Sequence, residues 1–169
     1  MEVENIKWEN YDIKSLDFIL NESENLLTET FKSFRELTNR CYYALGLYIA
    51  IFSFSITSII DNKASISRTP FLLIIVGICF ACYKIYPALI PTGMVFPGTK
   101  PANLLLKYFE EIPLNDQLNE LKIQTIVASN NGIEKNEQKL KEKTDSFKGS
   151  IYVFLITGLF CLFCFYMKW

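Results

Sequence analysis

The sequence contains no histidine among its 169 residues. Histidine is the most common general base of enzymes and a frequent zinc ligand, so its absence removes the usual catalytic triads and most zinc enzyme sites. A phosphate-binding GxxxxGK[ST] loop and a dinucleotide-binding GxGxxG motif are also missing. We therefore predict that the chain is not an enzyme and that it has no catalytic residue and no cofactor.

Half of the residues are hydrophobic, and they are concentrated in three blocks at 41–60, 71–90 and 151–167. A helix of each length would measure about 25–30 Å, which matches the hydrocarbon core of a bilayer. The first and third blocks contain no charged residue, and the second contains only Lys84. This pattern predicts an all-α membrane protein with three transmembrane helices.

The polar segments complete the predicted domain organisation. Residues 1–40 form an amphipathic N-terminal helix that continues into the first span, so that a single helix extends from about Glu22 to Ile60. Residues 61–70 form an outer loop, and 91–113 form a proline-rich elbow with a short interfacial helix at 102–112. Residues 114–150 form a stalk helix that leads into the third span, 151–169. Two spans are therefore extended by cytoplasmic helices.

The distribution of Lys and Arg predicts the orientation in the membrane. These residues are frequent before the first block, after the second and before the third, whereas the loop 61–70 contains only Lys63 and Arg68. By the positive-inside rule the N-terminus and the stalk are cytoplasmic and the C-terminus lies outside. Five tyrosines are expected at the inner interface: Tyr42, Tyr43, Tyr83, Tyr86 and Tyr152.

Neither polar region has the charge of a nucleic-acid-binding surface. Residues 1–40 contain nine acidic and five basic residues, and residues 93–149 contain eight of each. A nucleic-acid-binding domain usually presents a basic patch, so we expect no direct binding of nucleic acid. The bilayer is the first expected partner.

Each predicted span carries a stripe of small or weakly polar residues at offsets that place them on one helix face. Such stripes let helices approach closely in a membrane. Two interpretations stay open: packing of the three helices within one subunit, and a weakly polar lining of an oligomeric pore. The stripe residues are Gly46, Ala50, Ser53, Thr57, Gly77, Ala81, Lys84, Ala88, Thr157 and Cys161.

Lys84 is the single ionisable side chain of the three blocks, apart from the cysteines and tyrosines. Its position near the inner end of the second block allows the ammonium to reach the membrane surface, which is the simplest interpretation. A ring of Lys84 side chains at the inner mouth of a pore is the other interpretation, and it would favour anions.

All five cysteines lie in or beside the apolar blocks, so no disulfide framework is predicted. Two CxxC pairs, Cys79 with Cys82 and Cys161 with Cys164, would suggest zinc in a soluble chain. Cysteine is also a small apolar residue that packs well, and Cys79 and Cys82 point away from the stripe of their helix. We predict no metal site.

The stretch after the second block is rich in residues that interrupt helices. Pro87 is expected to kink the last turn of the second span, and Pro91 is expected to end it. The interpretation as a plain turn and the interpretation as a hinge between the span and the cytoplasmic part both stay open. The predicted hinge residues are Pro87, Pro91, Gly93, Pro97 and Gly98.

The stalk has a seven-residue pattern that is typical of coiled coils. Of the two sets of positions in this repeat, one is apolar and the other is polar in its middle. A buried polar residue at such a position would fix the register of the helices or the number of subunits. Packing within one subunit against residues 22–40 and self-association of stalks are both compatible with the pattern. The predicted register positions are Ile126, Asn130, Ile133, Glu137, Leu140 and Thr144.

The layout resembles that of small multi-span membrane effectors of bacterial anti-phage systems, including those encoded beside cyclic-nucleotide signalling enzymes or RNA-targeting CRISPR nucleases. The resemblance rests on the polar helix before the first span, NLLTETFKSFRELTNRCYYALGLYI, on the proline-rich exit of the second span, and on the charged stalk before the third, ASNNGIEKNEQKLKEKTDSFKGSIYVFLITGLF. It implies an oligomer in the bacterial inner membrane that permeabilises or depolarises the cell once infection is sensed. The arginine and histidine motif for RNA cleavage suspected in some CRISPR-associated members cannot exist here.

The leading hypothesis is a homo-oligomeric pore-forming or membrane-depolarising effector that is triggered through its cytoplasmic helices. Its expected partners are further copies of the chain and a soluble cytoplasmic sensor or effector protein. The alternative is a membrane anchor or adaptor that recruits a soluble partner through the stalk and conducts nothing.

Overall fold

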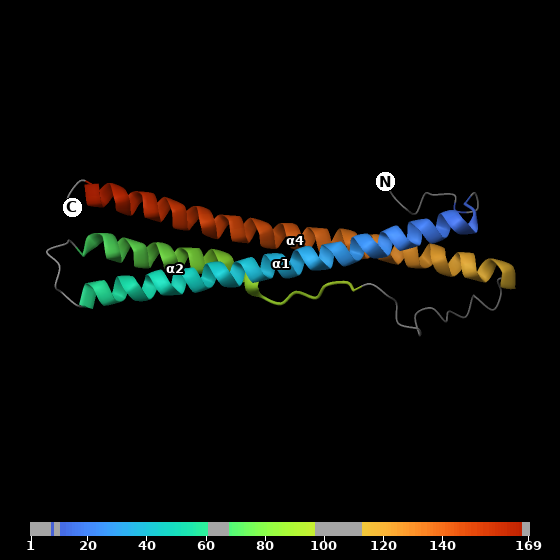
Figure 1. Ribbon diagram of the computed structural model, residues 1–169, viewed down its shortest axis with the longest axis horizontal. Helices are drawn as coiled ribbons and strands as arrows, with labels where there is room; N and C mark the ends of the chain where they lie inside the picture. Colours follow the sequence, from blue (N-terminus) through green and yellow to red (C-terminus); the bar gives the residue numbers. More distant parts are fainter. Residues whose placement is uncertain (1–7, 9–10, 61–67, 97–112, 167–169) are drawn as a thin grey trace. The chain divides into compact units, whose positions relative to one another are not determined.

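The computed structural model describes residues 8, 11–60, 68–96 and 113–166. Within these residues there are three α-helices and no strand: α1 (Ile13–Ile60), α2 (Thr69–Leu89) and α4 (Leu114–Tyr166) (Figure 1). The all-α prediction is confirmed. The predicted helix at 102–112 lies outside the described residues.

Local sequence explains where α1 begins and where α2 begins and ends. The carboxylate of Asp12 caps α1 by accepting a hydrogen bond from the backbone N–H of Ser15 (2.9 Å). Hydrogen bonds from the side chain and backbone of Ser15 lower the pKa of Asp12. α2 has Pro70 in its first turn, where no backbone N–H is needed. It ends before Pro91, as predicted, because the residue before a proline avoids the helical region, and Ile90 is extended (φ −62°, ψ 128°).

All three helices are long and apolar enough to cross a membrane. Many of their large apolar side chains are not covered by the chain itself: Phe54, Phe80, Leu159 and Phe163 are each more than half exposed. A soluble monomer rarely exposes so much contiguous apolar surface, whereas lipid accommodates it. The three predicted spans are therefore confirmed by length and composition. The tyrosines predicted at the inner interface are all exposed: Tyr42, Tyr43, Tyr83, Tyr86 and Tyr152.

The chain divides into two compact units, and α1 and α4 each contribute to both. The first unit comprises Met1–Phe34 and Thr92–Leu140, and the second comprises Arg35–Pro91 and Lys141–Trp169.

In the first unit, the initial part of α1 packs in parallel against α4. The carboxylate of Asp17 pairs with the ammonium of Lys122 at 2.6 Å. Further along both helices, the Nδ2 group of Asn136 donates a hydrogen bond to the Thr30 hydroxyl at 3.3 Å. Because both pairs advance in the same direction along the two helices, the helices run parallel.

The extended residues that follow α2 pack on this helix pair in the first unit. The rings of Phe31 and Phe96 lie 5.0 Å apart. Val95 packs close to Gly132, where an added Cβ would lie 2.9 Å from the Val95 side chain and 3.3 Å from Leu27. A glycine at position 132 is therefore needed for the close approach of these three segments.

In the second unit, the last part of α1, all of α2 and the last part of α4 lie side by side (Figure 1). The hydroxyls of Tyr48 and Ser150 are 3.3 Å apart, and the ring of Tyr48 lies 5.1 Å from that of Phe154. Phe54 and Phe71 contact each other at 6.5 Å, where α1 ends and α2 begins. α2 thus runs antiparallel to α1.

Buried positions recur every seven residues from Cys41 to Ser55 of α1 and from Ser129 to Ser150 of α4, as in a coiled coil. On α4 this seam is entirely polar, and on α1 it is mixed. The α4 seam consists of Ser129, Asn136, Lys143 and Ser150, and the α1 seam includes Leu27, Cys41, Tyr48 and Ser55.

Candidate functional site

The small residues of α2 and α4 meet inside the second unit. Gly77 is buried against the Thr157 side chain, and a Cβ at position 77 would overlap it. The Cys161 thiol donates a hydrogen bond to the Pro70 carbonyl (3.6 Å). The structure therefore brings two of the predicted stripes together within one chain.

The remaining stripe residues of α2 differ in exposure. Ala81 and Ala88 are fully buried. Lys84 lies between them in the sequence but is exposed, and it forms no ion pair or hydrogen bond with another described residue. The α2 stripe is thus a packing face from which one cation projects.

The stripe of α1 is not covered by the rest of the unit. Its four residues are all exposed: Gly46, Ala50, Ser53 and Thr57. The hydroxyl of Ser53 donates to the Ile49 carbonyl (2.9 Å), and that of Thr57 donates to the Ser53 carbonyl (3.0 Å). Both hydroxyl protons are therefore satisfied by the helix itself, so these residues tolerate a lipid environment.

Substitution of glycine by alanine should distinguish the α2 stripe, which packs against α4, from the α1 stripe, which is exposed. Gly77→Ala should destabilise the folded chain by about 1–3 kcal/mol, because the new methyl group overlaps Thr157 in a packed contact. Gly46→Ala is the matched control, since no atom lies within 4 Å of its added Cβ, and it should be neutral or slightly stabilising. Unfolding in mixed micelles with increasing dodecyl sulfate measures both. Equal stability of the two variants would contradict the close α2–α4 contact.

Lys143 holds the C-terminal end of α2. Its side chain is almost fully buried, and its ammonium donates to the carbonyls of Ala88 and Ile90, each at 2.7 Å. The last carbonyls of a helix have no partner within it. The Ile90 N–H donates only to the Tyr86 carbonyl (3.3 Å), and Pro91 has no N–H to donate. Lys143 replaces the missing donors and places positive charge at the negative end of the helix dipole. Burial lowers the pKa of this ammonium.

Asn136 holds the extended segment in the first unit. Its Oδ1 accepts a hydrogen bond from the Val95 N–H (3.0 Å), and its Nδ2 donates to the Val95 carbonyl (2.9 Å). The side-chain amide thus pairs with one residue of backbone as a neighbouring strand would. Lys139 also donates a hydrogen bond to the Gly93 carbonyl. Two residues of α4, one turn apart, therefore fix the segment.

The predicted stalk positions are placed as follows. Ile126 is buried, Asn130, Ile133, Leu140 and Thr144 are half-buried, and Glu137 is exposed. Asn130 donates to the Glu134 carboxylate of its own helix (3.1 Å). Their role in register or assembly stays a prediction.

The predicted hinge residues lie partly outside the described part of the chain, which includes neither Pro97 nor Gly98. Pro87 lies within α2, and Pro91 and Gly93 follow its end. The extended residues here are bound by Lys139 and Asn136. A hinge function stays a prediction.

Sequence reasoning missed the roles of Asn136 and Lys143. Polar residues of a charged helix are expected to face water, and the partners of both are backbone groups, which a sequence does not distinguish. The one available signal was the seven-residue spacing of Ser129, Asn136, Lys143 and Ser150.

No metal-binding arrangement appears in the described residues, where no group of three or more His, Cys, Asp or Glu side chains comes together. The five cysteines are free, with Cys41 and Cys161 buried and Cys79 exposed. Comparisons with protein-family models, with curated proteins and with solved structures found no match.

Proposed function

We propose that this chain is a homo-oligomeric effector that forms a pore in the bacterial inner membrane, or depolarises it, in anti-phage defence. In this proposal the N-terminus and the stalk are cytoplasmic and the C-terminus lies outside. The exposed stripe of α1 gives the main support. Its small residues are suited to close helix contact, yet no other part of the described chain covers them.

Copies of the chain that associate through α1 would place Ser53 and Thr57 at the contact or around a lumen. The small faces of α2 and α4 are already used within the chain, as the contact of Gly77 with Thr157 illustrates. α1 is thus the span best suited to assembly.

A trigger would act through the cytoplasmic helices. The division between the two compact units falls between Pro91 and Thr92, within the predicted hinge. In this proposal, movement of the first unit reaches α2 through the end that Lys143 holds.

A non-conducting membrane anchor or adaptor is the second candidate. The packing of α2 against α4 favours it, since two of three stripes then serve only to build one helix bundle. In this function a soluble partner binds the stalk and no lumen forms.

The native mass in mild detergent is the first test. We expect four or more subunits, which is enough for a closed ring around a channel. A monomer or a dimer would exclude a ring and favour the anchor.

Bulky substitutions on α1 then test the lining. Ser53→Trp and Thr57→Trp should reduce ion flux through proteoliposomes at least tenfold, because both side chains lie on the proposed lining. Ile56→Trp is the matched control, since Ile56 is exposed on another face of the same helix, and its flux should stay within about twofold of wild type. Wild-type flux in both stripe variants would reject the α1 lining.

A further inference from the structure

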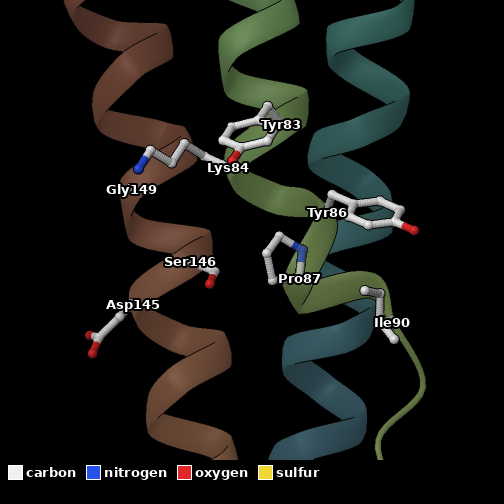
Figure 2. A pocket seen from close by; sticks show the side chains of 8 residues that line it. All are labelled: Tyr83, Lys84, Tyr86, Pro87, Ile90, Asp145, Ser146 and Gly149. Atoms are coloured by element: carbon white, nitrogen blue, oxygen red, sulfur yellow. The ribbon is translucent and has the colours of Figure 1, made fainter.

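An open groove lies between the C-terminal part of α2 and the facing part of α4 (Figure 2). Nothing lies within 4 Å of the position that a Cβ on Gly149 would take, so the absence of a side chain there keeps the groove open. The groove has a volume of about 560 Å³, and the residues that matter for its chemistry are Tyr83, Lys84, Tyr86, Asp145, Ser146 and Gly149.

The groove contains one cation and one anion that do not neutralise each other. Figure 2 shows the Lys84 side chain reaching from α2 toward α4 near Gly149, with Asp145 one helical turn away on α4. Both charged side chains are exposed, and neither forms an ion pair or hydrogen bond with another described residue. One turn of helix separates the levels of Gly149 and Asp145 by about 6 Å along the axis.

A second groove follows the same two helices on the other side of Lys84, which lines both. Its volume is about 330 Å³. Apart from Lys84, its walls are almost entirely apolar and include Leu73, Val76, Phe80, Val153, Ile156 and Phe160. A charged groove thus continues into an apolar one, and Lys84 lies where they meet.

The length of α2 places the two grooves at different depths in a membrane. Its 21 residues correspond to about 31 Å, close to the thickness of the hydrocarbon core. Lys84 is five residues from the end of α2 at Leu89, so it lies within about 8 Å of that end. The charged groove is therefore at the level of lipid headgroups, and the apolar groove is at the level of acyl chains.

We infer that the two grooves together bind one phospholipid whose headgroup carries both a phosphate and a primary ammonium, as in phosphatidylethanolamine. Lys84 binds the phosphate, and Asp145 accepts hydrogen bonds from the ammonium. The hydroxyl of Ser146 donates to the Glu142 carbonyl (3.1 Å), so its oxygen remains an acceptor for the same ammonium. One acyl chain follows the apolar groove.

This arrangement distinguishes headgroups by their charge and by the N–H donors of their ammonium group. Phosphatidylglycerol has the phosphate but no ammonium, so nothing in it matches Asp145. Phosphatidylcholine has a quaternary ammonium, which has no N–H to donate to a carboxylate. The lipid with a primary ammonium should therefore bind most tightly. This site does not depend on whether the chain forms a pore.

Native mass spectrometry of the detergent-solubilised protein, titrated with each of the three lipids, tests the inference. Wild type should bind phosphatidylethanolamine at least fivefold more tightly than either of the others. Lys84→Gln should weaken binding of all three about tenfold, because each presents a phosphate. Asp145→Asn should remove the preference and leave phosphatidylglycerol binding unchanged or stronger.

Two kinds of control variant test whether the effects are specific to the groove. Lys148→Gln and Glu137→Gln remove exposed charges elsewhere on α4 and should not alter lipid binding. Gly149→Leu fills the groove and should abolish bound lipid, whereas Gly158→Leu, also in open space on α4, should not. Equal binding of the three lipids by wild type, or full binding by Lys84→Gln, would overturn the inference. A change of subunit number with Lys84→Gln and no lipid preference would assign the groove to a second copy of the chain instead.

Discussion

Lys143→Met is expected to destabilise the folded chain by about 2–4 kcal/mol, the largest effect of any single lysine substitution on α4. A hydrogen bond from a charged donor contributes about 1.5–3 kcal/mol. This substitution removes one to the buried Ala88 carbonyl and one to the partly buried Ile90 carbonyl, while relief of the buried charge offsets part of the loss. Dodecyl sulfate titration in mixed micelles measures the change. Hydrogen exchange at the end of α2 should also become faster.

Lys141→Met is the matched control for this substitution. It removes the same charge from an exposed position of the same helix. Its effect should stay within about 0.5 kcal/mol, as for most surface substitutions. If Lys143→Met is as stable as Lys141→Met, the ammonium does not hold the end of α2. The proposed path from the first unit to α2 would then lack the contact on which it depends.

Asn136→Ala is expected to release the extended segment at Val95. It removes three hydrogen bonds and leaves the N–H and C=O of Val95 without their partner, at a cost of about 1–3 kcal/mol for each group that stays buried. Protection of the Val95 amide against hydrogen exchange should fall at least tenfold. The stability of the chain should fall by about 3 kcal/mol.

Two further variants distinguish hydrogen bonding from loss of volume. Asn136→Asp keeps the shape and still accepts from the Val95 N–H, but its second oxygen faces the Val95 carbonyl, so it should also be destabilised. Asn131→Ala changes an exposed asparagine on the same helix and should have little effect. A stable Asn136→Asp variant would show that packing alone holds the segment.

The sequence was sufficient to predict the spans, because their signal is local. The blocks 41–60, 71–90 and 151–167 have the length and the apolar composition that a membrane requires, and α2 ends at Leu89, one residue before the predicted limit. The start of α1 at Ile13, before the predicted Glu22, follows from the Asp12 cap. A cap depends on only a few residues and is a weaker signal than twenty apolar ones.

The interior of the α1–α4 pair could not be predicted in the same way. The α4 seam that becomes buried contains Asn136 and Lys143, and such residues are rarely buried unless they are paired. Their partners are the backbone groups of Ala88, Ile90 and Val95, which become available only where α2 ends and the chain becomes extended. Sequence patterns report side chains, so contacts of this kind appear only in the folded chain.

The hydroxyls of α1 that donate to carbonyls of their own helix have a consequence for ion selectivity. The protons of Ser53 and Thr57 are committed to carbonyls of their own helix, so the outward surface presents oxygen lone pairs. A lumen built on this face would carry negative partial charge along its wall and would favour the passage of cations. Lys84 lines the grooves between α2 and α4, and a ring of Lys84 side chains that would favour anions stays a prediction.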